Sequence, residues 1–134
     1  MPVNYDKVPR MVTSLAAQLN AFLSQPKEKM NALNTSFHAH FDLVTVHPFY
    51  DGNGRTSRLL MNHLQHRTDL PLAIVFKEDK ADYFDALVAS RKNRDVGIFQ
   101  GFMHEQYQKL LGQEIDNFKA SQKPSQGRKY SLIF

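Results

Sequence analysis

The sequence of 134 residues has no cysteine and no hydrophobic run long enough to cross a membrane, and its N-terminus shows no charged-then-apolar signal pattern. Without cysteine, the chain can form neither a disulfide nor a thiolate metal site. A membrane-spanning helix would need roughly 18 consecutive apolar residues. These absences exclude the disulfide-stapled and membrane-spanning classes. We expect a small globular domain with a cytoplasmic location and no membrane partner.

Acidic residues are absent from residues 119–134, which carry Lys119, Lys123, Arg128 and Lys129. These four side chains account for the whole net charge of +4, so residues 1–118 are neutral overall. A nucleic-acid-binding domain is expected to carry its positive charge on the folded body. The charge pattern therefore argues against a nucleic-acid partner. We interpret residues 119–134 as a basic, mobile tail.

Apolar residues recur at helical spacing through most of the chain, and proline or turn residues separate the periodic segments. In the third segment the pattern places Leu59, Leu60, Met61 and Leu64 inward. Residues 72–76 form the only strand-like run, and a single strand without a partner makes no sheet. The sequence therefore predicts an all-α, compact domain of about five helices over residues 1–118. The predicted helices cover residues 9–24, about 26–46, about 54–68, 79 to about 91, and 95 to about 118.

One stretch, residues 47–58, gathers most of the residue types that carry chemistry (HPFYDGNGRTSR). A helix that begins right after residues 52–54 offers unpaired backbone N–H groups and the positive end of its dipole. The glycines of this segment allow a positive φ and a close approach of the backbone to a ligand. Arg55 and Arg58, spaced i and i+3, project to one side, and guanidinium groups suit phosphate oxygens. The stretch therefore predicts a polyphosphate site.

Asp51 and His47 add a carboxylate and a base to the same loop. A carboxylate beside an anion site is explained if a hard cation lies between them, and Mg²⁺ commonly binds one or two carboxylates together with substrate phosphates. His47 precedes Pro48, so it should lie just past a helix C-terminus. An imidazole with an ordinary pKa of about 6.5 accepts a proton at neutral pH. These groups together suggest attack of a hydroxyl on a nucleotide phosphate.

The stretch differs from the two common nucleotide-binding motifs, because it lacks the Gly-x-x-x-x-Gly-Lys-Ser/Thr pattern and does not follow a strand. It matches instead, at every fixed position, the signature of the Fic family, His-Pro-Phe-x-Asp-Gly-Asn-Gly-Arg-x-x-Arg. The segment before it, residues 37–46, and the helices after it are also similar to that family. The resemblance covers about residues 8–118.

The resemblance implies an all-helical domain that transfers AMP from ATP to a protein hydroxyl with Mg²⁺. By position, His47 would deprotonate a Ser, Thr or Tyr hydroxyl, Asp51 would hold Mg²⁺ against the α- and β-phosphates, and pyrophosphate would leave. The Doc branch has lysine in place of Gly54 and phosphorylates, so the glycine favours AMP transfer. The other roles carried over are an anion nest of Gly52, Asn53 and Gly54 with Asn53 on the α-phosphate, Arg55 on the β-phosphate, Arg58 on the γ-phosphate, and Phe49 in the core as an anchor of the loop.

Two usual features of the family are not found in this sequence. One is the β-hairpin flap upstream of the first helix, which aligns the target segment. The other is an inhibitory helix with the pattern Ser/Thr-x-x-x-Glu-Gly/Asn. We therefore expect either a C-terminal piece of a larger protein or control by a separate regulator that carries the inhibitory helix. The expected partner is a protein with a hydroxyl side chain, and a homo-oligomer stays open.

Three alternatives stay open beside AMP transfer. The chain could be a catalytically idle Fic-like module that binds nucleotide or protein, it could transfer another phosphate-linked group, or it could bind nucleic acid through its tail. Individual residues also have plain structural interpretations. Asp51 could cap the following helix, Arg58 could pair with Asp51 or Asp42, and His38 and His40 are expected to be solvated or hydrogen-bonded structural side chains.

Overall fold

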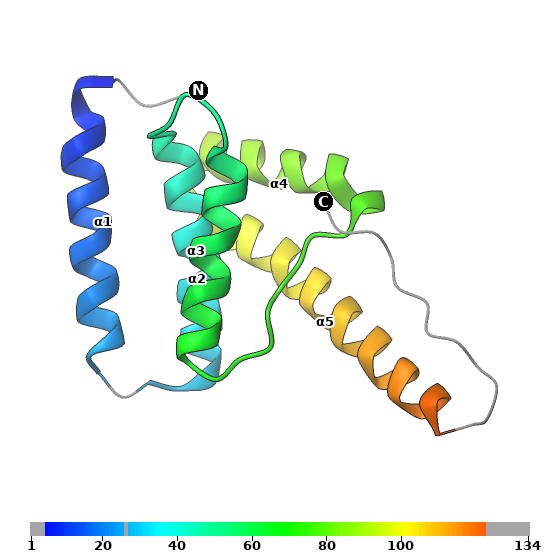
Figure 1. Cartoon of the computed structure of the whole chain (residues 1–134). Coiled ribbons are helices and arrows are strands. Elements are labelled where there is room, and N and C mark those ends of the chain that lie inside the picture. Colours follow the sequence, from blue (N-terminus) through cyan, green and yellow to red (C-terminus); the bar gives the residue numbers. More distant parts are fainter. Residues whose placement is uncertain (1–4, 26, 123–134) are drawn as a thin grey trace. The chain divides into compact units, whose positions relative to one another are not determined.

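The computed structural model describes residues 5–25 and 27–122, and within these ranges it contains helices and no strand (Figure 1). This confirms the predicted all-α class with five α-helices in the described part. The elements are η1 (Tyr5–Lys7), α1 (Val8–Leu23), α2 (Lys29–Val46), α3 (Asn53–Arg67), η2 (Lys77–Asp79), α4 (Lys80–Asn93) and α5 (Val96–Ser121). None of these helices combines the length and hydrophobicity that a membrane crossing requires.

The predicted helix bounds agree with the structure to within about three residues. The largest differences lie at the start of α2, which begins at Lys29 rather than near residue 26, and at the end of α5, which continues to Ser121. Glu28 has an extended backbone with ψ 145°, so the helical geometry begins after it. Because α5 continues to Ser121, Lys119 lies in the last turn of that helix. The rest of the predicted tail, from residue 123 onward, lies outside the described residues.

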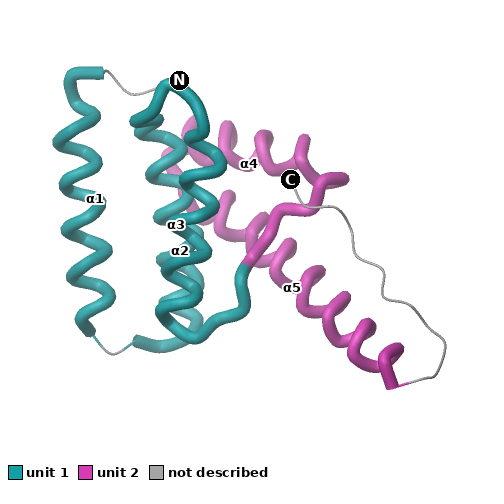
Figure 2. The backbone as a smooth tube through the Cα atoms, in the orientation of Figure 1, with its two compact units in different colours: residues 1–72 teal, residues 73–134 magenta. Residues whose placement is uncertain are grey.

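The chain divides into two compact units, Met1–Leu72 and Ala73–Phe134 (Figure 2). The first unit contains α1, α2 and α3, and residues 47–58 form the connection between α2 and α3 and the first turns of α3. The second unit contains η2, α4 and α5. All residues that the sequence predicts for the active site therefore belong to the first unit.

In the first unit, α2 and α3 pack along each other and share a core that includes fully buried Phe37 and Met61. Burial of one such side chain contributes about 1.5–3 kcal/mol. A buried polar link also crosses this interface, since Gln65 Nε2 donates to Ser36 Oγ at 3.0 Å and Ser36 Oγ donates to the Leu33 carbonyl at 2.6 Å. This packing holds the end of α2 and the start of α3, the two ends between which the predicted site lies.

The inward prediction for Leu59 is wrong, because its side chain is 70% exposed. The buried positions of this part of α3 are Ser57, Met61 and Leu64. Successive residues of an α-helix are about 100° apart, so Leu59 points to the side opposite to Ser57. An apolar residue that is adjacent in sequence to the buried positions of a helix is thus not always buried itself.

In the second unit, a hydrogen-bonded cluster joins the segment before α4 to α5. The N–H of Phe76 donates to Gln106 Oε1 at 2.9 Å, and Gln106 Nε2 donates to Asp79 Oδ2 at 2.9 Å. Lys109 Nζ lies 2.9 Å from Glu78 Oε1 and 2.9 Å from Asp79 Oδ2. The hydrogen bonds from Gln106 and Lys109 lower the pKa of Asp79. These charged groups therefore stabilise the second unit.

Candidate active site

His47 lies where the sequence predicts it, directly after the last residue of α2. It is the C-terminal cap of that helix, with φ 56° and ψ 57°, and its N–H donates to the Leu43 carbonyl at 3.0 Å. A left-handed residue is a common way to end a helix, and the following Pro48 disfavours helical geometry in the residue before it. The His47 side chain is exposed. The imidazole is thus carried at a helix end, open to a substrate.

Asn53 closes the loop that follows. Its Oδ1 accepts a hydrogen bond from the N–H of Phe49 at 2.9 Å, and its Nδ2 donates to the carbonyl of Phe49 at 2.8 Å. The residue is buried. The side-chain amide that the resemblance assigns to the α-phosphate is therefore engaged in holding residues 49–53 as a closed turn. The N–H groups of this turn are positioned by that pair of bonds.

Gly52 gives the start of α3 its geometry. It is the N-terminal cap with φ 80° and ψ 14°, a left-handed conformation that glycine adopts at little cost. Its carbonyl accepts the N–H of Thr56 at 2.9 Å, and no side chain caps the helix. The N–H groups of the first turn have no acceptor within the helix, and the helix dipole adds positive potential there. The structure therefore has, at Gly52, a helix start of the geometry that the predicted anion site requires.

The two arginines lie beside the loop glycines. A Cβ atom added to Gly52 would lie 3.4 Å from Nη2 of Arg55, and a Cβ atom added to Gly54 would lie 3.4 Å from Nη1 of Arg58. Both guanidinium groups therefore reach back to the N-terminal end of α3. Two fixed positive charges and a helix N-terminus at one place suit a polyanion, since guanidinium groups bind phosphate oxygens in a bidentate manner.

Asp51 places a carboxylate at the edge of this positive site. Its Oδ1 accepts the N–H of Gly52 at 2.8 Å, and its Oδ2 lies 3.9 Å from Arg55 Nη2. The side chains of Asp51 and Arg55 are 88% and 77% exposed, so the pair itself contributes little to stability. Asp51 bonds to Gly52 and does not cap α3, for which no side-chain cap is found.

The donor set fits magnesium when phosphate oxygens complete it. No group of three or more His, Cys, Asp or Glu side chains that could hold a metal gathers among the described residues. Mg²⁺ does not need one, because it commonly takes one or two carboxylates, substrate phosphates and water. Asp51 supplies one exposed hard oxygen ligand next to the anion site. We therefore regard Asp51 as a fitting ligand for Mg²⁺ bound together with a nucleotide.

His40 is a buried residue next to the site, and the sequence did not predict that it lies there. It is completely buried on α2, it is hydrogen-bonded to the backbone of Ser57, and it lies near Arg58. Burial, and secondly the charge of Arg58, lower the pKa of His40 to about 3. The imidazole is therefore neutral at physiological pH. His40 links α2, which carries His47, to the first turns of α3, which carry the arginines.

His38, two residues earlier on α2, is half-exposed and pairs with Asp42, with Nε2 3.3 Å from Oδ1. The hydrogen bond with Asp42 raises the pKa of His38. Both histidines thus have the structural contacts that were expected of them.

The assignment of Phe49 to the core is wrong, because its side chain is 48% exposed. It lines an apolar pocket of about 310 Å³ together with residues of α1, α2 and α3. The loop is anchored instead by the backbone of Phe49 through Asn53, since both polar atoms of that amide bond to it. The backbone, which the motif pattern does not reveal, therefore does the anchoring.

Replacement of Gly52 by alanine tests the geometry of this turn. We expect a free energy of unfolding lower by about 1–2 kcal/mol, because a Cβ atom is unfavourable at φ 80°. Gly101→Ala is the matched control, since nothing lies within 4 Å of its added Cβ in the described structure and alanine in a helix interior is favourable by about 1 kcal/mol. Urea denaturation of both variants measures the difference. Equal stabilisation by both substitutions would contradict the left-handed turn.

Comparisons with known proteins relate the sequence of this chain to one family. The sequence model of the Fic/DOC family matches residues 1–65, a range that includes the whole stretch 47–58. A protein named "Protein adenylyltransferase Fic" from Nematostella vectensis is 41% identical over 86 residues, which cover 61% of this chain and 20% of that protein. Proteins of the same name from Drosophila persimilis and Drosophila ananassae are 38% and 39% identical over 88 residues, covering 66% of this chain and 17% and 18% of theirs. The chain thus spans about a fifth of the length of these relatives.

Proposed function

We propose that this chain, whose residues 1–65 match the sequence model of the Fic/DOC family, transfers AMP from ATP to a Ser, Thr or Tyr hydroxyl of a target protein. The observation that carries this proposal is the helix start at Gly52, with two guanidinium groups beside the loop glycines and one carboxylate at the edge. The names of the relatives support adenylyl transfer as the reaction class. A cytoplasmic location goes with this proposal as a prediction.

The phosphates of ATP bind at the N-terminus of α3. The N–H groups of residues 53–55 and the guanidinium groups of Arg55 and Arg58 surround the negative charge, with Arg55 on the β-phosphate and Arg58 on the γ-phosphate. We assign the contribution of Asn53 on the α-phosphate to its backbone, because its side chain is bonded to Phe49. Gly52 and Gly54 leave the space for this approach.

His47 acts as the general base. Its ring takes the proton from the target hydroxyl, the hydroxyl oxygen attacks the α-phosphorus, and a new phosphorus–oxygen bond forms. The bond between the α-phosphorus and the oxygen that bridges to the β-phosphate breaks, and pyrophosphate carries that electron pair away. Arg55 and Arg58 stabilise the negative charge that develops on the leaving group.

Asp51 is the residue that would hold Mg²⁺. When bound, the ion neutralises negative charge on the phosphates and orients them for in-line attack. Its affinity in this site depends on the nucleotide, because Asp51 is the one carboxylate of residues 47–58. The role of the protein is to keep that carboxylate beside the helix start through the Gly52 N–H.

A label-transfer assay tests the proposed reaction. The chain is incubated with Mg²⁺ and a protein extract or candidate target, once with ATP labelled at the α-phosphate and once with ATP labelled at the γ-phosphate. We expect label on protein from the α-position only, and none after chelation of Mg²⁺. Transfer from the γ-position would indicate phosphorylation instead. CTP, GTP, UTP and nucleotide-diphosphate cholines in parallel reactions identify any other transferred group.

The second candidate is a catalytically idle module that binds nucleotide. An observation in its favour is that both polar atoms of the Asn53 side-chain amide, which the resemblance assigns to the α-phosphate, bond to the backbone of Phe49. Calorimetry with ATP and Mg²⁺ separates the two functions. Binding of the nucleotide without label transfer to any protein of the extract would support the idle module.

A further inference from the structure

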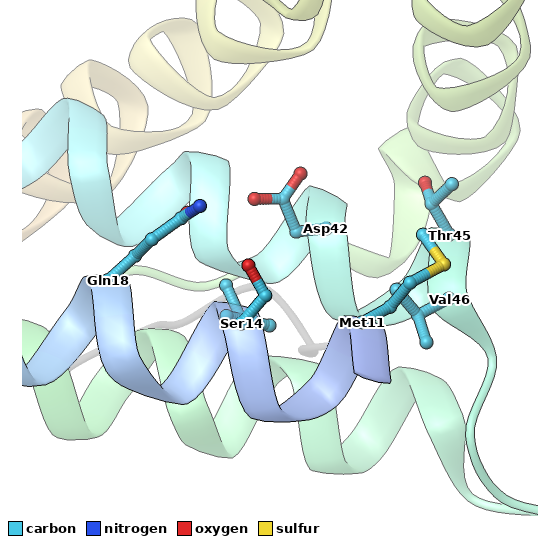
Figure 3. A pocket seen from close by; sticks show the side chains of 7 residues that line it. Met11, Ser14, Gln18, Asp42, Thr45 and Val46 are labelled. Atoms are coloured by element: carbon cyan, nitrogen blue, oxygen red, sulfur yellow. The ribbon is translucent and has the colours of Figure 1, made fainter. Parts of the chain in front are cut away.

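A second pocket of the first unit lies between α1 and α2 (Figure 3). Its volume is about 210 Å³. A water molecule takes about 30 Å³ of liquid volume, so the pocket has room for one long amino-acid side chain. The lining residues are Met11, Ser14, Leu15 and Gln18 of α1 and Asp42, Thr45 and Val46 of α2.

The lining combines an apolar floor with one negative charge. Leu15 and Val46 are buried, and Asp42 is the only charged residue among those that line the pocket. Figure 3 shows the side chains of Ser14 and Gln18 extending from α1 toward α2, from which the Asp42 carboxylate projects. The negative potential at the C-terminal end of α2 is opposed by the N-terminal end of α1, where Met11 lies, so the Asp42 carboxylate is the charge that decides the preference.

Such a pocket is complementary to a cationic head on an apolar stem. Lysine and arginine side chains place their methylene groups along apolar surface and keep the charge at a polar rim. A carboxylate attracts that charge, and hydroxyl and amide oxygens accept its N–H groups. An acidic side chain would meet the Asp42 carboxylate and would be repelled by it.

The position of the pocket relates it to the reaction. Its wall ends with Thr45 and Val46, and the next residue of the chain is His47. A target segment that presents its hydroxyl to His47 extends about 3.3 Å per residue. A residue a few positions from the modified hydroxyl can therefore reach the pocket.

We propose that this α1–α2 pocket binds a lysine or arginine side chain of the target protein, close in sequence to the modified hydroxyl. The inference rests on the proposed function. It adds a target preference, because the pocket selects a positive charge near the hydroxyl.

His38 is the titratable neighbour of the Asp42 carboxylate within α2. Its Nε2 lies 3.3 Å from Oδ1 of Asp42, and the Asp42 side chain is 34% exposed. This contact uses Oδ1, so Oδ2 serves the ligand. His38 thereby holds the carboxylate in one orientation.

The first experiment measures binding without nucleotide. Short alanine–glycine peptides with one Ser, Thr or Tyr carry lysine at each of several distances from the hydroxyl, and matched peptides carry norleucine instead. In NMR titrations of the full chain we expect lysine peptides of one spacing to shift the amide signals of Ser14, Gln18 and Thr45, with affinity about five- to tenfold above the norleucine peptide. Equal affinity of lysine and norleucine peptides at every spacing would overturn the proposal.

Asp42→Asn is the test variant, and Asp69→Asn is its matched control, because Asp69 is an exposed aspartate of the first unit that does not line the pocket. We expect the lysine preference to vanish in D42N and to persist in D69N. A preference that survives in D42N would also overturn the proposal.

Label transfer from ATP to the same peptides separates this proposal from the proposed function. We expect a KM about five- to tenfold lower for the preferred lysine peptide, with kcat unchanged. Transfer with equal KM for both peptides leaves the function standing and overturns the pocket. Lysine-specific NMR shifts without any transfer leave the pocket standing and overturn the function.

Discussion

His47→Ala is expected to reduce AMP transfer to a target protein by about 10²- to 10⁴-fold, the usual contribution of a general base. The side chain is exposed at the end of α2, so its removal leaves no cavity, and the change in stability should stay within about 0.5 kcal/mol. The phosphates bind to α3 in our proposal. The dissociation constant of ATP with Mg²⁺ should therefore remain within about twofold of the wild-type value, measured by calorimetry.

Two further variants make this result specific. His47→Asn keeps a residue that tolerates the left-handed backbone at φ 56° and removes the base, so it should lose activity to the same extent. His63→Ala removes an exposed histidine from α3 and should leave activity unchanged. If H47A and H47N transfer label at the wild-type rate, His47 is not the base, whatever the reaction.

Acidification is expected to lower the free energy of unfolding substantially through protonation of His40. Burial lowers the pKa of His40 to about 3, whereas an unfolded histidine titrates near pH 6.5. The unfolded state therefore binds more protons between these values, and the stability that is present above pH 6.5 is lost as the pH falls toward 3. The slope from this one group reaches about 1.4 kcal/mol per pH unit. Urea denaturation at a series of pH values measures it.

Carboxylates also titrate in this range, so the comparison between variants isolates His40. His40→Gln should be less stable at pH 7, because it disturbs a buried position, but its stability should fall less steeply between pH 6.5 and 4. His38→Gln is the control on the same helix. The pKa of His38 is raised, chiefly by its hydrogen bond with Asp42, so its contribution is present below pH 6.5 and is lost as the pH rises. If the free energy of unfolding falls with pH equally steeply in the wild type and in H40Q, the folded and unfolded states have the same His40 pKa and the prediction is wrong.

Local rules explain why much of the site could be predicted from the sequence. Proline after His47 ends α2 at that point, and glycine at position 52 permits the left-handed turn from which α3 starts. The spacing of Arg55 and Arg58 then places both side chains on the first turns of α3. Each of these inferences needs only neighbours in the chain, and the helix bounds followed from them to within a few residues.

The errors concern how far a side chain is buried, which depends on the packing of one helix against another. Phe49 is a large apolar residue, which suggests that its ring anchors the loop in the core. Instead, the ring is half-exposed, and the hydrogen bonds between the Phe49 backbone and Asn53 hold the loop. The pattern also left His38 and His40 equivalent, although one pairs with Asp42 near the surface and the other is completely buried. Burial depends on which helix packs against which face, and sequence spacing does not contain that information.

By itself, the sequence determined the all-helical class, the C-terminal end of α2, the start of α3 and the chemical groups of residues 47–58. Turn geometry and helix periodicity act over a few residues, so neighbours in the chain suffice for these features. Only the tertiary structure decided that His40 is neutral between α2 and α3 and that α1 and α2 enclose a pocket with a single carboxylate. Both depend on desolvation and shape, which arise when separate helices pack together and exclude water.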